Sequence, residues 1–264
     1  MFNSKKQLED TLINEAIGIG ITHEIAKFFF GGKKKAAEKE AATNGYSHTA
    51  KYRGSDVIET EGGDYSEFEK LITENESTVG IIFGARGTGK SAMAMRIMED
   101  VRARTGRKCM AMGFNGSALP NWIKTVDDMK DLENDSFIVI DEGGVLFSAR
   151  DSMSDANKMV SSLLLIARHK NMSILFITQN SANMEINTIR QADYLLLKPS
   201  SLLQMHFERP VIGKIYESIE DKMKKYRKDY RGLTYVYADN FQGYFNNGLA
   251  SFWNEDISKN FSEV

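Results

Sequence analysis

The stretch from Val79 to Ser91 limits the possible folds of this chain more than any other part. An apolar run, Val-Gly-Ile-Ile-Phe, is followed by Gly84-Ala-Arg-Gly-Thr-Gly-Lys90-Ser91, which matches the pattern G-x-x-x-x-G-K-[ST] at every fixed position. Glycines allow successive backbone N–H groups to turn toward phosphate oxygens at a helix N-terminus. The stretch therefore predicts a strand, a phosphate-binding loop and a helix within an α/β fold.

The side chains of this predicted loop suit a magnesium nucleotide. The Lys90 ammonium would reach the terminal phosphates, and the Ser91 hydroxyl would bind a Mg²⁺ ion that bridges them. The positions expected to contact ATP are Gly84, Arg86, Gly87, Thr88, Gly89, Lys90, Ser91 and Ala92. The alternative is a glycine-rich turn that precedes a lysine by chance, but this would not explain the strand and helix patterns on either side.

Two further predicted strands end in polar residues. Phe137-Ile-Val-Ile-Asp141-Glu142 has the form of a Walker B strand, so Asp141 is expected to hold a Mg²⁺-bound water and Glu142 to activate the attacking water. Ser173-Ile-Leu-Phe-Ile-Thr178 is followed by Gln179, which could sense the γ-phosphate or orient water. Ligands bind at the carboxyl ends of strands in open α/β sheets. The alternatives are exposed acids and an ordinary loop residue.

The remaining patterns predict alternating helices and strands. Helices are expected at residues 65–72, 90–104, 154–168 and 210–230, and further strands at 108–114, 193–198 and 233–238. We therefore expect an α/β fold with a mainly parallel central sheet flanked by helices, which together with the loop and strand-end motifs resembles a P-loop NTPase of the ASCE (RecA-like) type. The expected parts are an N-terminal helix and polar arm at 1–63, the ATPase core at 64–210 and a helical C-terminal extension at 211–264.

The N-terminal segment, residues 7–30, predicts a helix with one apolar face. Apolar side chains recur at every fourth position, at Ile13, Ile17, Ile21, Ile25 and Phe29. This face could dock on the protein's own core or on a neighbouring subunit, or it could bind a membrane surface or a capsid protein. The segment contains too many charged residues for a membrane span.

Charge and cysteine content narrow the possible partners. The chain of 264 residues has a formal net charge of −2, so a DNA partner would have to be met by local patches. One such patch is a predicted basic cluster with interleaved tyrosines: Lys222, Lys224, Lys225, Tyr226, Arg227, Lys228, Tyr230 and Arg231. It could follow a phosphate backbone or be a solvated helix face. The single cysteine, Cys109, favours a reducing, cytoplasmic setting.

Together these motifs resemble the FtsK-HerA superfamily of hexameric DNA pumps. The likeness spans about residues 79–198 and is most specific in Ile166-Ala-Arg-His-Lys-Asn-Met-Ser-Ile-Leu-Phe-Ile-Thr-Gln179. The resemblance implies that Glu142 is the general base and that Gln179 couples nucleotide state to movement. It also implies that an arginine, Arg168 or Arg150, reaches the nucleotide of a neighbouring subunit.

The chain departs from the cellular members of this superfamily. Asn180-Ser181 stands where FtsK-type motors carry Arg-Pro, and no strand series for an N-terminal barrel is evident. The remaining likeness is to genome-packaging ATPases of membrane-containing tailless viruses, including archaeal ones. It implies an ATP- and Mg²⁺-dependent hexamer that moves double-stranded DNA in the host cytoplasm, with capsid or membrane proteins met by the N-terminal helix. The alternative is a Zot-like, membrane-associated assembly or export ATPase of a filamentous virus.

Overall fold

Strands from most of the chain join one sheet. The computed structural model describes residues 45–74, 77–128, 131–141 and 153–258, and the sheet of these residues has nine strands in the order β1-β9-β8-β7-β2-β6-β5-β3-β4. The strands are β1 (Asp56–Gly63), β2 (Val79–Phe83), β3 (Lys108–Met112), β4 (Ile123–Thr125), β5 (Ser136–Asp141), β6 (Ser173–Ile177), β7 (Tyr194–Leu197), β8 (Leu233–Ala238) and β9 (Phe241–Asn246).

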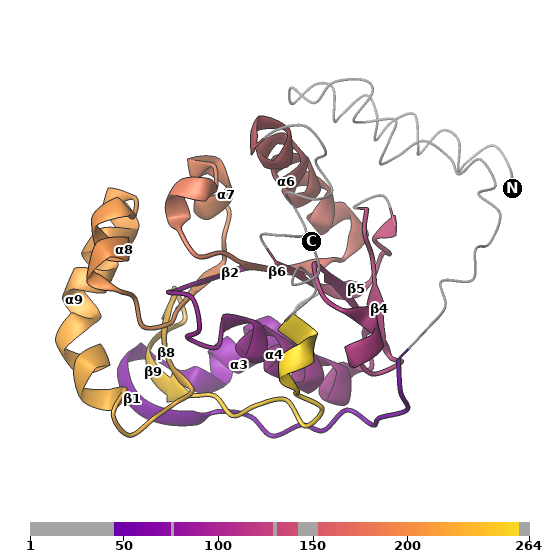
Figure 1. Ribbon diagram of the computed structural model, residues 1–264, viewed down its shortest axis with the longest axis horizontal. Coiled ribbons are helices and arrows are strands. Elements are labelled where there is room, and N and C mark those ends of the chain that lie inside the picture. The colour runs from indigo at the N-terminus through magenta and orange to yellow at the C-terminus, as the bar shows by residue number, and fades with distance from the viewer. Residues whose placement is uncertain (1–44, 75–76, 129–130, 142–152, 259–264) are drawn as a thin grey trace, which may run out of the picture.

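Helices cover both faces of the sheet (Figure 1). They are α3 (Tyr65–Thr73), α4 (Lys90–Thr105), α6 (Met153–Ala167), α7 (Ile186–Arg190), α8 (Leu202–Phe207) and α9 (Pro210–Tyr226). Side chains alternate across a strand, so Ile81 of β2 packs with α6 and α9 while its neighbour Ile82 packs with α3 and α4. The result is a three-layer α/β/α sandwich with a core on each side of the sheet.

The parallel part of the sheet brings the predicted strand ends together. β7, β2, β6, β5, β3 and β4 run parallel to one another, and every residue of β2 and β6 is buried. Strands buried on both faces read as continuous apolar runs, which is why these were visible in the sequence. β6 lies between β2 and β5, so the carboxyl ends of these three strands lie next to each other. The predicted fold class is confirmed.

The opposite part of the sheet is antiparallel and was only partly predicted. β8 was expected, but β9 was not, and β1 lies in the stretch that was expected to be a polar arm. β1 is an edge strand with only one partner, so it needs few apolar residues: Ile58 contributes to the core, while Glu59 and Glu61 face Lys222 of α9. The C-terminal part is therefore not wholly helical. The expected division into three parts stays a prediction, and the N-terminal helix at 7–30 lies outside the described residues.

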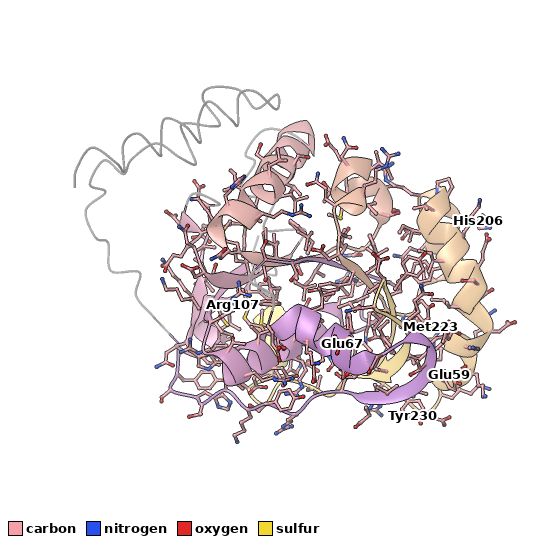
Figure 2. The ribbon with its side chains drawn as sticks, turned by 180° about the vertical axis from the view of Figure 1, so that it is seen from behind. Glu59, Glu67, Arg107, His206, Met223 and Tyr230 are labelled. Atoms are coloured by element: carbon pink, nitrogen blue, oxygen red, sulfur yellow. The ribbon has the colours of Figure 1, made fainter. Side chains whose placement is uncertain are left out.

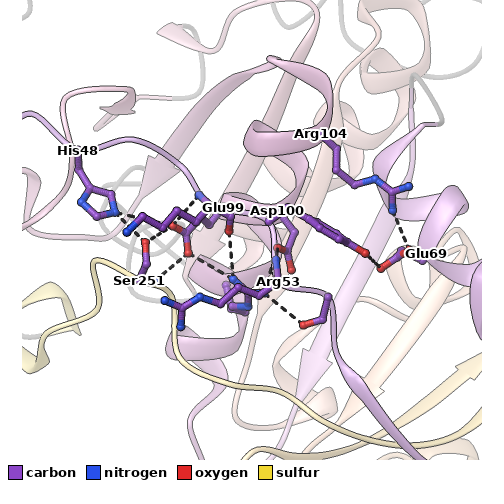
Figure 3. A network of polar contacts seen from close by, with 11 residues as sticks. His48, Arg53, Glu69, Glu99, Asp100, Arg104 and Ser251 are labelled. Atoms are coloured by element: carbon purple, nitrogen blue, oxygen red, sulfur yellow. Dashed lines mark hydrogen bonds and ion pairs between the residues drawn. The ribbon is translucent and has the colours of Figure 1, made fainter.

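A strap formed by residues 45–55 crosses α4 and is held by buried acids (Figure 3). Glu99 is fully buried, pairs with Arg96 at 3.4 Å and accepts hydrogen bonds from the backbone N–H groups of Lys51 (3.1 Å) and Ser251 (2.7 Å). Asp100 pairs with Arg96 at 3.1 Å and has its pKa raised to about 6 by burial. One turn of α4 thus anchors two segments that are distant in sequence.

Aromatic contacts anchor the C-terminal segment on the core. Phe252 is buried and packs edge-on against Trp122 with ring centroids 5.5 Å apart. The turn that follows is a single 3-10 helix, Glu255–Ser258. Aromatic packing rather than helix length therefore fixes this segment on the core.

Candidate nucleotide-binding site

The loop between β2 and α4 has the backbone form of a phosphate-binding loop. Gly87 and Gly89 have φ values of 77° and 84°, in the left-handed region that side-chain-bearing residues avoid. Gly89 is the N-cap of α4 and has no side chain to cap the helix. The first-turn N–H groups of this 16-residue helix therefore face the loop, and the positive end of the helix dipole favours an anion there.

The start of the loop is held by the end of β7. The Lys198 N–H donates to the Phe83 carbonyl oxygen at 2.8 Å, and the Ala85 N–H donates to the Pro199 carbonyl oxygen at 3.2 Å. These bonds continue the β2–β7 pairing beyond the strands themselves. The first residues of the loop are therefore fixed to the sheet by backbone hydrogen bonds.

Lys90 lies inside the loop. Its ammonium donates to the carbonyl oxygens of Gly84 at 2.8 Å and Ala85 at 3.0 Å, and only 8% of the residue is exposed. The ammonium therefore lies within the loop, where a phosphate group would bind. Arg86, by contrast, is exposed at the rim of the loop.

The start of α4 and the end of β5 meet at a pair of oxygen groups. The Ser91 hydroxyl at the start of α4 lies 3.5 Å from Oδ2 of Asp141, the last residue of β5. Mg²⁺ prefers oxygen ligands and commonly binds proteins through one carboxylate, a hydroxyl and substrate phosphates. The donor set therefore fits a magnesium ion next to the loop. Glu142, the next residue, lies outside the described residues.

Gln179 follows β6, between these two strand ends. The residue is exposed, and its backbone carbonyl oxygen accepts a hydrogen bond from Nε2 of Gln204 on α8. Nearby, Glu208 accepts from the Ser181 N–H at 2.8 Å. Hydrogen bonds thus connect the segment after β6 to α8 and to the residues just before α9. A movement of the Gln179 backbone would therefore be passed to these helices.

Neither predicted arginine is seen at the nucleotide site of its own chain. Arg168 is exposed and follows α6, just before β6 begins, so it lies at the sheet edge opposite the phosphate loop of its own chain. A role toward a neighbouring subunit is untested by this placement. Arg150 lies outside the described residues.

Lys198 is a site residue that the sequence reasoning missed. It is 1% exposed, and its ammonium donates to the Gly232 carbonyl oxygen and the Thr234 hydroxyl, each at 3.0 Å. Burial lowers the pKa of Lys198 to about 7. The sequence signal for this residue was a lysine at the end of an apolar strand, just before a proline. A charged residue at such a point must either reach solvent or be buried with polar partners.

Comparison with known proteins gives one family match. The profile of the Zonular occludens toxin (Zot) family matches residues 119–228, which include β5, β6 and β7 but not the phosphate loop. A comparison with curated protein sequences finds no match.

Several solved structures are similar to this chain. The genome packaging NTPase B204 from Sulfolobus turreted icosahedral virus 2, in complex with ATP-gammaS, has 13% identity and a TM-score of 0.45, over 66% of this chain and 100% of that one. The N-terminal domain of zonular occludens toxin from Neisseria meningitidis has 15% identity and a TM-score of 0.30, over 46% and 76%. EssC (ATPases 2 and 3) from Geobacillus thermodenitrificans has 12% identity and a TM-score of 0.40, over 83% and 49%.

The predicted resemblance to P-loop ATPases of the viral packaging and Zot kind is confirmed as a resemblance. At these identities, residue roles are not transferred from those structures to this chain. Within the part of the chain that the structure describes, no helix has the length and apolar character needed to cross a bilayer.

Proposed function

We propose that this protein is a P-loop ATPase of the viral packaging or assembly kind that couples ATP hydrolysis to movement of double-stranded DNA. The observation that carries the proposal is the approach of the Ser91 hydroxyl to the Asp141 carboxylate at 3.5 Å, beside the loop that encloses Lys90. Two groups from the start of α4 and one from the end of β5 thereby lie where a magnesium triphosphate would bind.

Each residue has a role in this proposal. The loop N–H groups and Lys90 hold the phosphates, and Ser91 and Asp141 hold the Mg²⁺ sphere, which offsets the charge on the phosphates when the ion is bound. Glu142 orients and deprotonates the attacking water. Gln179 senses the γ-phosphate and passes its state to α8 through Gln204.

The proposal includes a ring of subunits, most simply a hexamer, in which a neighbour supplies Arg168 or Arg150 to the nucleotide. An arginine in trans stabilises the charge of the transition state and makes hydrolysis depend on assembly. B204, described as a genome packaging NTPase and solved with an ATP analogue, supports the viral packaging kind. We place the protein in the host cytoplasm, with capsid or membrane proteins met through the N-terminal helix.

A Glu142→Gln variant tests the assignment of the ATPase site. We expect it to bind ATP normally and to hydrolyse it slower by on the order of 100-fold or more, because the general base is lost while the loop is intact. Glu133→Gln is the matched control, since Glu133 lies before β5 at the opposite sheet edge and pairs with Lys108 and Lys124. Undiminished hydrolysis by Glu142→Gln would contradict the assignment.

A second candidate function is a Zot-like ATPase that serves assembly or export of a filamentous virus at a membrane. The specific observation in its favour is the Zot family match over residues 119–228. Liposome flotation of the intact chain and of one lacking residues 1–35 separates the two. Nucleotide-independent membrane insertion would favour export, whereas rings threaded by duplex DNA in electron micrographs, with a non-hydrolysable ATP analogue, would favour packaging.

A further inference from the structure

The turn after α9 carries a positive surface that the proposed function leaves unassigned. This basic turn, residues 227–231, holds three exposed cations, Arg227, Lys228 and Arg231. Two cations earlier in the same run are neutralised locally. Lys222 binds Glu59 at 2.8 Å and Glu61 at 2.5 Å, while Lys224 binds Glu220 at 2.7 Å. Lys225 of α9 is exposed as well and lies over the Tyr226 ring, and the turn also holds one exposed acid, Asp229. The turn thus presents three cations and one acid, an excess of positive charge.

The basic turn lies at the same sheet edge as the phosphate loop. Phe83, the last residue of β2, pairs with Leu197 of β7, and Leu197 pairs with Tyr235 near the start of β8. Because β8 runs antiparallel to β7, it begins where β2 ends. The residues just before β8, including Arg231, are thus next to the nucleotide edge.

Lys198 joins the two features directly. Its backbone N–H donates to Phe83 at the start of the loop, while its ammonium donates to the carbonyl oxygen of Gly232, the residue after the basic turn. One residue thereby spans from the phosphate loop to the end of the turn. A movement of the phosphate loop can therefore be passed to the basic turn, or the reverse, through the buried Lys198.

Aromatic packing holds the turn in place. The rings of Tyr226 and Tyr230 meet edge to face with centroids 6.4 Å apart, and Tyr226 packs on Tyr244 of β9 at 5.4 Å. In Figure 2, Tyr230, Glu59 and Met223 lie at one end of the molecule, where α9 crosses β1. The exposed cations are therefore presented from a fixed base.

We propose that the basic turn binds the phosphate backbone of double-stranded DNA, an assignment that rests on the proposed function. The whole chain has a net charge of −2, so attraction to a polyanion has to come from such a local group of cations. Cations that contact phosphates release counterions from the duplex, which makes binding depend on salt. Placement beside the phosphate loop allows DNA contact and nucleotide state to influence each other.

The test compares two triple variants of the full chain with equal change in net charge. The first is R227Q/K228Q/R231Q, and the control is K51Q/R53Q/K214Q, which removes three exposed cations elsewhere. Duplex binding is measured by fluorescence anisotropy against salt concentration, with a non-hydrolysable ATP analogue present. We expect the first variant to bind on the order of tenfold more weakly, with a salt slope smaller by about 3. The control should keep the slope of the unmodified protein, and both should keep basal ATP hydrolysis.

The outcomes that overturn the assignment are distinct. Equal slopes for the first variant and the unmodified protein would show that the basic turn does not contact DNA, although the DNA motor itself would stand. An unmodified protein that hydrolyses ATP but binds no duplex at any salt concentration would reject the DNA partner and this surface together. Loss of binding to phosphatidylserine vesicles by the first variant, with duplex binding unchanged, would assign the turn to a membrane surface.

Discussion

Lys198 lies directly behind Gly84: a Cβ atom on residue 84 would come within 2.6 Å of the Lys198 Cβ atom and 3.1 Å of the Thr88 hydroxyl. The first glycine of the phosphate loop is therefore required by its neighbour on β7 as well as by its own backbone, whose φ is 150°. Support from behind explains how a glycine-rich loop can hold one conformation.

Gly84→Ala should abolish most nucleotide binding and lower the free energy of unfolding by about 2 to 4 kcal/mol, because the added methyl group meets Lys198 and the backbone is strained. Fluorescent ATP titration and urea unfolding measure the two effects. Gly106→Ala is the matched control, since Gly106 has a φ of 70° with open space around its Cβ position at the far end of α4. It should cost about 1 kcal/mol and leave nucleotide binding intact. Equal binding by both variants would contradict the close approach of Lys198.

Lys198→Met should change how stability depends on pH. Burial lowers the pKa of Lys198 from 10.5 to about 7 in the folded protein, so above about pH 7 the unfolded chain binds more protons at this residue than the folded chain does. The free energy of unfolding of the unmodified protein should therefore rise, relative to the variant, between about pH 7 and pH 9. Below about pH 7 both states are protonated, and the difference should be constant. Parallel urea-denaturation profiles across the whole range would show that Lys198 keeps its ordinary pKa.

Ser91→Ala and Asp141→Asn should each remove the magnesium-dependent part of ATP binding. Their oxygens lie 3.5 Å apart, at the start of α4 and the end of β5, and each variant removes one oxygen donor from the proposed ion. We expect affinity in Mg²⁺ to fall by on the order of tenfold or more, toward the affinity measured in EDTA. Thr105→Ala, at the other end of α4, is the control hydroxyl. A full magnesium response in both site variants would place the ion elsewhere.

Glu99→Ala should destabilise the protein strongly through its effect on the strap. Glu99 and Arg96 form an i,i+3 pair in which both side chains are at most 1% exposed, so removing the acid takes one acidic partner from a buried arginine that also pairs with Asp100. We expect a loss of about 3 to 5 kcal/mol by urea unfolding. Glu67→Ala removes an i,i+3 pair with Lys70 whose side chains are more than half exposed, and it should cost less than about 1 kcal/mol. Similar losses for the two variants would show that burial does not set the strength of the Glu99 contacts.

The strands that could be predicted from the sequence are mostly buried on both faces of the sheet. β2 and β6 are buried at every position, so their apolar runs could be recognised. β1 reads Asp-Val-Ile-Glu-Thr-Glu-Gly-Gly and is mostly exposed or half-buried, so nothing local distinguishes it from a polar loop. Its strand form comes from pairing with β9, a partner almost 200 residues away, which no local pattern reveals.

The candidate site was predictable where chemistry follows a motif. The loop glycines, Lys90 and Ser91 are given by fixed spacing, and Asp141 follows from its place at the end of an apolar strand. Lys198 was not predicted as a site residue, because its role depends on the β2–β7 pairing and on contact with Gly232. The residues next to Lys198 in the sequence indicate neither contact. The same holds for the basic turn, whose position at the nucleotide edge depends on the direction of β8.

The pairing of β1 with β9 also constrains how the molecule can be made. Asp56 lies opposite Asn246 and Val57 opposite Phe245, so this edge of the sheet stays incomplete until the residues of β9 have left the ribosome. Until then the nascent chain holds the acids of β1 without their strand partner. The edge formed by β1, whose Glu59 and Glu61 bind Lys222, can therefore close only after β9 has been made.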